Sequence, residues 1–90
     1  MTLGVLRDPR LRVIEAMTLL TSETPDGRYL AEATELGEVG LGSTPARALY
    51  DLQRTIAELY WACLADPHRL GPGMAAIWAV LQRKVQEVPR

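Results

Sequence analysis

The sequence contains a single cysteine and a single histidine among its 90 residues. One cysteine excludes an internal disulfide framework and a zinc site built from thiolates, and one histidine excludes a histidine-rich metal site. No apolar run approaches the roughly 18 to 20 residues that span a bilayer, and the N-terminus lacks the apolar segment of a signal peptide. We therefore expect a cytoplasmic chain that uses no metal, no cofactor and no membrane anchor.

A large net charge is also absent, because 11 acidic side chains face 10 basic ones and the net charge is −1. An apolar content of 48% with 23% charged residues is typical of a folded domain and excludes intrinsic disorder. A chain of this length encloses one core at most. We expect residues 1–90 to form a single domain.

The small net charge hides a segregation along the chain. Residues 15–44 have a net charge of −5, whereas residues 1–14 and residues 66–90 each have a net charge of +2. An acidic middle segment repels a phosphate backbone and attracts a basic protein surface. The alternative is a solvated polar face that has no partner.

Two strands and a turn are predicted in the first half of the chain. Residues 11–21 favour a strand, at least in their second half, over a short helix capped by Asp8. Thr24-Pro25-Asp26-Gly27 has turn chemistry, since proline presets φ and glycine accepts a positive φ. Residues 28–36 then return as the second strand of a hairpin, with Tyr29, Ala31 and Ala33 on its core side.

A third, irregular strand is predicted at residues 38–42, where closely spaced glycines permit a bulge or a close backbone approach. A phosphate-binding loop is the alternative, but the glycine spacing matches no such motif and the segment is acidic. These strands form an expected three-stranded antiparallel meander over residues 11–42.

A long helix is predicted over residues 44–66. Thr44 caps it, Pro45 occupies its first position and Pro67 ends it. A second helix is predicted over residues 74–88, with Arg83 and Lys84 facing solvent. The predicted fold class is α+β, a meander packed by one long helix with a second C-terminal helix. One face of the long helix carries an apolar stripe made of Leu49, Leu52, Ile56, Leu59 and Cys63.

Catalytic chemistry has little support. The only histidine, His68, lies in a proline-bounded loop, and Cys63 lies on the apolar stripe, where a small core residue is typical. No pair of carboxylates is placed on one face of a predicted cleft, as acid–base catalysis requires. We expect a protein that is not an enzyme.

The long helix is apolar on a second side as well. A helix with two apolar sides needs cover on both, either from the second helix or from another subunit. A chain this small gains much buried area by self-association, so we favour a homodimer. The predicted interface consists of Tyr50, Ala57, Trp61, Leu64 and Met74.

The order of these elements suggests a family. Residues 26–36 (DGRYLAEATEL), followed by residues 42–49 (GSTPARAL), resemble the HicB-like antitoxin superfamily over about residues 18–62. The sequence departs from the family pattern at Gly37-Glu38, where a Pro-Gly step is usual, and at Ser43, where aspartate is usual. The resemblance implies a partial double-stranded-RNA-binding-domain fold of three strands and a helix, in a shortened or stand-alone member.

The resemblance also implies a role. Members are non-catalytic proteins that bind a basic partner, which in that family is a small RNA-cleaving toxin. Independently, the acidic hairpin would attract and cover a basic surface, so we predict that Glu32, Glu35 and Glu38 bind the partner. The alternative is a small nucleic-acid-binding protein that uses its basic termini, with Tyr60 and Trp78 stacking on bases.

Overall fold

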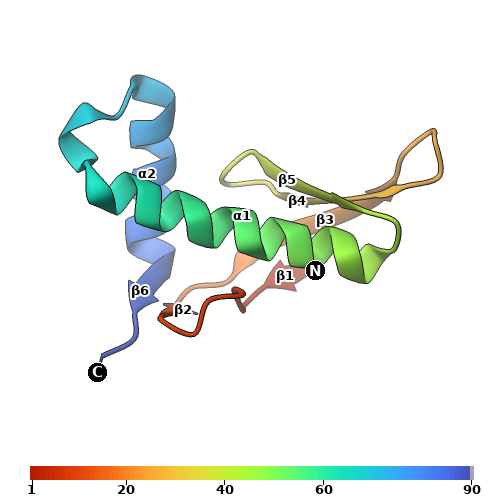
Figure 1. Ribbon diagram of the computed structural model, residues 1–90, viewed down its shortest axis with the longest axis horizontal. Helices are drawn as coiled ribbons and strands as arrows, with labels where there is room; N and C mark the ends of the chain where they lie inside the picture. Colours follow the sequence, from red (N-terminus) through yellow and green to blue (C-terminus); the bar gives the residue numbers. More distant parts are fainter. Residues whose placement is uncertain (90) are drawn as a thin grey trace.

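A long helix packed across one face of an antiparallel sheet dominates the computed structural model (Figure 1). The structure describes residues 1–89, and within them it has the predicted α+β architecture. In chain order the elements are β1 (Thr2–Leu3), β2 (Leu11–Val13), β3 (Met17–Glu23), β4 (Tyr29–Ala33), β5 (Glu38–Gly42), α1 (Pro45–Ala65), a short 3₁₀ helix (Pro67–Arg69), α2 (Pro72–Lys84) and β6 (Val85–Glu87).

The β3–β4 hairpin forms where the turn residues predict it. Gly27 has φ of +83°, a conformation that glycine adopts without a steric penalty. The strand register pairs Leu19 with Ala33 and Glu23 with Tyr29. Ala31 and Ala33 are fully buried, which confirms that this side of β4 faces the core.

The main sheet has four strands in the order β1-β3-β4-β5, one strand more than the expected three-stranded meander. Thr2 and Leu3 form an additional strand beside Thr18 and Met17. Leu3 thereby becomes a core residue, with 2% of its surface exposed. A strand of two residues is too short to show an alternating pattern in the sequence.

The expected placement of residues 11–13 is also wrong, because β2 leaves the main sheet and pairs with β6 in a separate two-stranded sheet. The helix alternative for this region, capped by Asp8, is wrong as well. The second helix was expected over residues 74–88 but ends at Lys84. Val85 is instead extended and buried opposite Val13, a conformation that β-branched side chains favour.

Helix α1 begins and ends where the sequence predicts. The Thr44 side chain accepts a hydrogen bond from the Arg47 amide at 3.1 Å, and Pro45 is the first helical residue. The helix stops at Ala65, ahead of Pro67. Its predicted apolar stripe faces the sheet, with Leu52, Ile56 and Cys63 completely buried.

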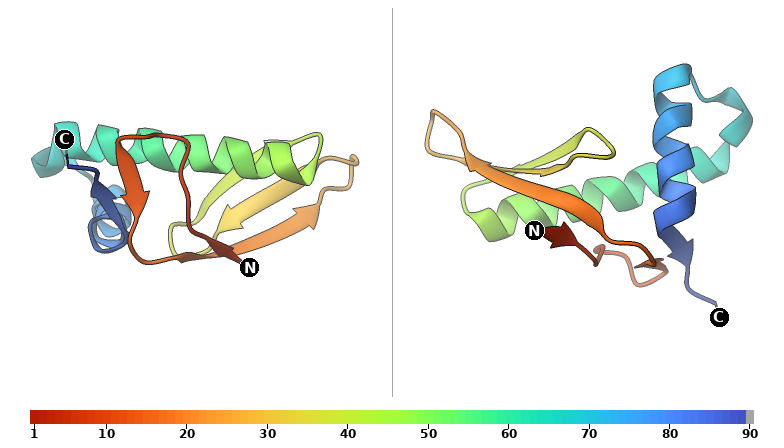
Figure 2. Two further views of the ribbon diagram at one scale, coloured as in Figure 1. Left: turned by 90° about the horizontal axis from the view of Figure 1, so that it is seen from below. Right: turned by 180° about the vertical axis from the view of Figure 1, so that it is seen from behind.

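Close packing of α1 on β5 depends on two glycines of that strand. A Cβ atom at Gly40 would overlap backbone atoms of Ala48 and Leu52, and one at Gly42 would overlap the backbone of Arg47 and Ala48. The glycines predicted to allow a close backbone approach therefore face the helix. The view from below in Figure 2 shows α1 lying across this side of the sheet.

Lys84 lies inside the fold and not on its solvent side, which corrects the sequence prediction. Its residue surface is 6% exposed, and Nζ pairs with Glu15 Oε1 at 3.1 Å. The Lys84 carbonyl accepts hydrogen bonds from the Ile14 and Glu15 amides, so the end of α2 is fixed to the segment between β2 and β3. Among residues 1–89, no helix is long and apolar enough to cross a membrane.

Candidate functional site

One face of the main sheet has no helix over it in the described part of the chain. Helix α1 covers the side that carries Ala31, Ala33 and Gly40. Paired residues of antiparallel strands point to the same side, and successive residues alternate. The register therefore places two cross-strand rows on the opposite side, Leu20-Glu32-Val39 and Ser22-Leu30-Leu41. We call these six residues the open face.

The open face is more apolar than an exposed sheet surface usually is. Leu20 is 52% exposed, Val39 43% and Leu41 40%, and Leu30 is half-buried beside them. Antiparallel sheets with one solvated face normally place polar residues there. A contiguous apolar group with a polar rim is typical of a protein-binding surface.

Glu32 is the only charged residue of the open face. It lies between Leu20 and Val39 in the register and is half-buried. It is therefore surrounded by aliphatic groups on the neighbouring strands. A cationic side chain of a partner could pair with this carboxylate while its apolar surroundings are buried.

The structure does not bring the three predicted partner-binding carboxylates onto one surface. Glu38 pairs with Ala33 in the register, so it lies on the α1 side of the sheet. Glu35 lies in the β4–β5 turn, where both of its carboxylate oxygens accept from the Thr18 amide at 3.0 Å. This backbone hydrogen bond lowers the pKa of Glu35. Only Glu32 is thus positioned to meet a partner on the open face.

The second apolar side of α1 is covered by the chain's own N-terminal segment, residues 4–10. The Gln53 amide donates to the Val5 carbonyl at 3.1 Å, and its oxygen accepts from Arg7 Nε at 3.0 Å. The Arg7 guanidinium lies 5.0 Å from the centre of the Tyr50 ring. The N-terminal segment thus covers part of this side of α1, and Trp78 of α2 packs on Tyr60 farther along the helix.

The predicted dimer interface is consequently divided. Ala57 is 5% exposed and belongs to the core, and Trp61 donates to Asp8 through its indole nitrogen. Tyr50 and Leu64 are exposed, at 49% and 38%, and Met74 is half-buried. The five residues therefore offer a second copy of the chain a smaller exposed surface than the sequence predicts.

The two basic ends of the chain lie together, because β2 pairs with β6. Two of their arginines are engaged within the fold, whereas Arg83 is exposed. Arg10 forms an ion pair with Asp8 at 2.8 Å, and Arg12 donates to Gln86 at 3.2 Å. Arg90 lies outside the described residues. The arrangement offers less free positive charge than the sequence suggests.

The residues considered for catalysis lie apart. His68 is exposed in the 3₁₀ helix, and Cys63 is fully buried in α1, where burial raises the pKa of its thiol. Within residues 1–89, no group of three or more His, Cys, Asp or Glu side chains could hold a metal ion.

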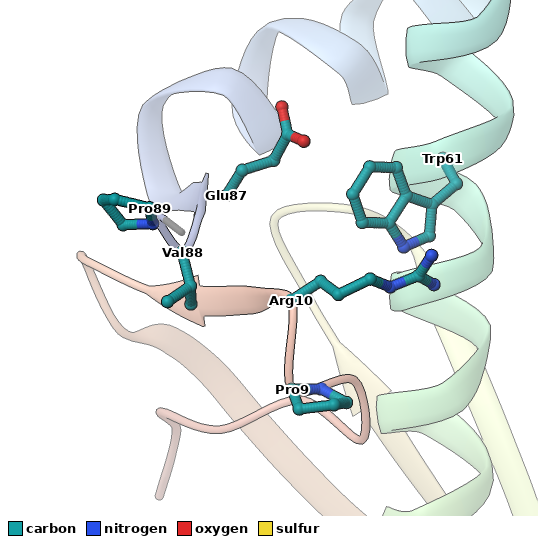
Figure 3. Close-up of a pocket in the computed structure, with 6 residues that line it drawn as sticks. All are labelled: Pro9, Arg10, Trp61, Glu87, Val88 and Pro89. Carbon is teal, nitrogen blue, oxygen red and sulfur yellow. The ribbon is translucent and has the colours of Figure 1, made fainter.

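Sequence reasoning missed the cluster around Asp8. This carboxylate accepts from the Arg10 side chain at 2.8 and 3.0 Å and from Trp61 Nε1 at 2.7 Å. Arg10 also lies 4.5 Å from the centre of the Trp61 ring, and Figure 3 shows both side chains beside Glu87 of β6. Gln53 is the polar residue of α1 that binds this N-terminal segment, through the Val5 carbonyl and Arg7.

No family model, curated protein or solved structure matches the chain.

Proposed function

We propose that this chain is a non-enzymatic protein-interaction domain that binds a basic protein partner through the open face. The observation that carries the proposal is the position of Glu32 at the centre of an exposed aliphatic group. Apolar burial would supply the affinity. The single carboxylate would orient the partner and select a positive charge.

The resemblance to HicB-like antitoxins supports the same class of function. It implies a partner that is a small, basic RNA-cleaving toxin, occluded when the domain binds it. The acidic middle segment, with a net charge of −5 over residues 15–44, would speed the encounter with such a protein. The proposal differs from the sequence prediction in one respect, since Glu32 acts with Leu20 and Val39 and not with Glu35 and Glu38.

The homodimer is a separate proposal. A second copy would contact the exposed residues Tyr50 and Leu64, which lie away from the open face on the helix. The partner on the open face and the second copy would then bind at the same time.

The test compares proteins captured from the native host by four tagged chains. Wild type and the control Glu58→Lys, which reverses a 65%-exposed carboxylate on α1, should retain a stoichiometric small basic protein. Glu32→Lys and Leu20→Asp should lose it, because a like charge or a buried carboxylate at the contact costs about 3 kcal/mol or more, which is at least roughly a 100-fold loss of affinity. Circular dichroism should show all four folded, since both altered residues point away from the core.

The captured protein is then purified and tested for RNA cleavage. Wild-type chain should stop the cleavage at equimolar concentration, and Glu32→Lys should not. Retention of the partner by Glu32→Lys and Leu20→Asp would contradict the proposed face. Recovery of nucleic acid without a protein, with steep salt dependence, would favour the alternative function at the basic termini.

A further inference from the structure

A hollow of about 410 Å³ lies between α1, the end of α2 and β6, at the other end of the molecule from the open face. Figure 1 shows α2 and β6 beside the C-terminal half of α1, whereas the N-terminal half of α1 lies beside the β3–β5 end of the sheet. One part of its lining is aromatic and aliphatic, and the other part carries two amides and a carboxylate. The residues are Tyr60, Leu64, Trp78, Val85, Gln82, Gln86 and Glu87.

The aromatic part is rigidly built. The Tyr60 and Trp78 rings meet edge to face with centroids 5.2 Å apart, and Trp61 packs on the other side of Tyr60 at 5.3 Å. Tyr60 and Trp78 are 7% and 8% exposed, so the small surface that each shows is held in place by the core. Aromatic rings bind planar cations over their faces, and a ring that the core already holds in place loses little further side-chain entropy on binding.

Among residues 1–89, Glu87 is the only charged residue that lines this hollow. Figure 3 shows its side chain extending from β6 toward α1. No ion pair among residues 1–89 includes Glu87. The nearest cation on the neighbouring side, Arg10, already shares its charge with Asp8 at 2.8 Å.

The carboxylate of Glu87 is close enough to act on the aromatic part. Burial, and secondarily the negative charge of Glu87, raise the pKa of Tyr60. The Gln86 oxygen accepts from Arg12 at 3.2 Å. The other polar groups of the lining residues are the Glu87 carboxylate, the Gln82 amide, the Gln86 amide nitrogen and the Tyr60 hydroxyl. Glu87 thus forms no ion pair within residues 1–89, and its charge acts on Arg10 only in addition to the stronger interaction of Arg10 with Asp8.

We propose that this hollow binds the side chain of an arginine presented by a partner segment. The guanidinium would pair with Glu87 through two parallel N–H groups, a geometry that suits a carboxylate. The aliphatic stem would lie against Leu64 and Val85, and the planar group would contact Trp78. The proposal is independent of the open face, because it uses none of the same residues.

The experiment uses capped tripeptides, acetyl-Gly-Arg-Gly-amide and the matching peptide in which uncharged citrulline replaces arginine. The chain contains two tryptophans, Trp61 and Trp78, one in the hollow and one beside it, so intrinsic fluorescence reports binding directly. The arginine peptide should give a saturable change in tryptophan fluorescence with a dissociation constant in the millimolar range. This corresponds to a binding free energy of about −4 kcal/mol. Citrulline peptide should bind at least about tenfold more weakly, since the charged hydrogen bonds are lost.

Two variants complete the test. Glu87→Gln should weaken the arginine peptide about tenfold and remove its preference over citrulline, whereas Glu58→Gln should match wild type. Glu87 is exposed on β6, so its substitution should leave the fold intact, as judged by circular dichroism. Equal affinity for the two peptides, or unchanged binding by Glu87→Gln, would overturn the proposal. Equal affinity for a lysine peptide would overturn the selection of guanidinium.

The two proposals fail separately. Glu32→Lys should bind the arginine peptide as wild type does, and Glu87→Gln should retain any partner held by the open face. Loss of peptide binding in Glu32→Lys would show that the peptide occupies the open face and not this hollow.

Discussion

The Trp61 indole nitrogen donates a hydrogen bond to Asp8 Oδ2 at 2.7 Å, joining residues 53 positions apart. The bond fixes the N-terminal segment across the side of α1 that faces away from the main sheet. Arg10 completes the cluster, because its guanidinium both pairs with Asp8 and lies 4.5 Å from the centre of the Trp61 ring. An arrangement that needs an ionised aspartate makes stability depend on pH.

We expect Asp8 to contribute to stability only while it is ionised. Its hydrogen bonds to the Arg10 side chain, and then to Trp61, lower its pKa far below the ordinary 3.8, against an opposing effect of burial. A carboxyl whose pKa is lower in the folded state than in the unfolded state stabilises the fold when it is ionised. This stabilisation is complete above the unfolded-state pKa, about 4, and is lost as the pH falls from there through the folded-state pKa. The free energy of unfolding, measured with urea, should therefore fall less between pH 6 and pH 3 for Asp8→Asn than for wild type.

The control for this experiment is Glu23→Gln, which removes an exposed carboxylate that has no ion pair within residues 1–89. Its loss of stability between pH 6 and pH 3 should match that of wild type. If Asp8→Asn also matched wild type, the Asp8–Arg10–Trp61 cluster would contribute nothing to stability.

Gly40→Ala should destabilise the domain by about 2 to 4 kcal/mol. Its Cβ would overlap the Ala48 oxygen and the Leu52 nitrogen, which are backbone atoms of α1 that cannot rotate away. The matched control is Gly73→Ala in α2, where nothing lies within 4 Å of the added atom. That variant should gain up to about 1 kcal/mol from helix propensity. If Gly40→Ala and Gly73→Ala changed the thermal unfolding temperature equally, α1 would not approach β5 as closely as described.

Truncation of Leu19 should cost much more stability than truncation of its neighbour Leu20. Leu19 is 5% exposed beneath α1 and Leu20 is 52% exposed on the open face. Leu19→Ala should cost about 2 to 4 kcal/mol by leaving a cavity. Leu20→Ala should cost less than about 1 kcal/mol, because about half of the Leu20 surface stays in contact with water and its removal leaves no enclosed cavity. Similar losses in denaturant unfolding would indicate a strand register shifted by one residue.

Removing Glu15 should cost more stability than replacing its partner Lys84. Lys84 has a side chain that is 8% exposed, whereas Glu15 is 62% exposed. Glu15→Gln leaves the largely buried Lys84 ammonium without its carboxylate and should cost about 1 to 2 kcal/mol of stability. This cost is smaller than that of breaking a fully buried ion pair, because the Glu15 side chain is hydrated. Lys84→Met replaces the cation with an apolar chain of similar length and should be nearly neutral. A larger loss in Lys84→Met than in Glu15→Gln would contradict this account.

Several elements could be predicted from the sequence because local chemistry specifies them. Thr44 and Pro45 supply a helix start, Pro67 follows the helix end, and Gly27 supplies the turn of the hairpin. In each case the determining contact lies within a few residues along the chain, as the Thr44–Arg47 hydrogen bond does. The α+β class follows from these elements taken together.

The remaining features were decided only by tertiary structure. Val85 and Val88 satisfy a helical spacing equally well, and β2 pairing across more than 70 residues made Val85–Glu87 a strand. The cover over α1 and the position of Glu87 beside Tyr60 likewise depend on segments far apart in sequence. Periodicity shows which side of an element needs burial. It carries no information about which distant segment supplies that burial, because the choice depends on the packing of the whole chain.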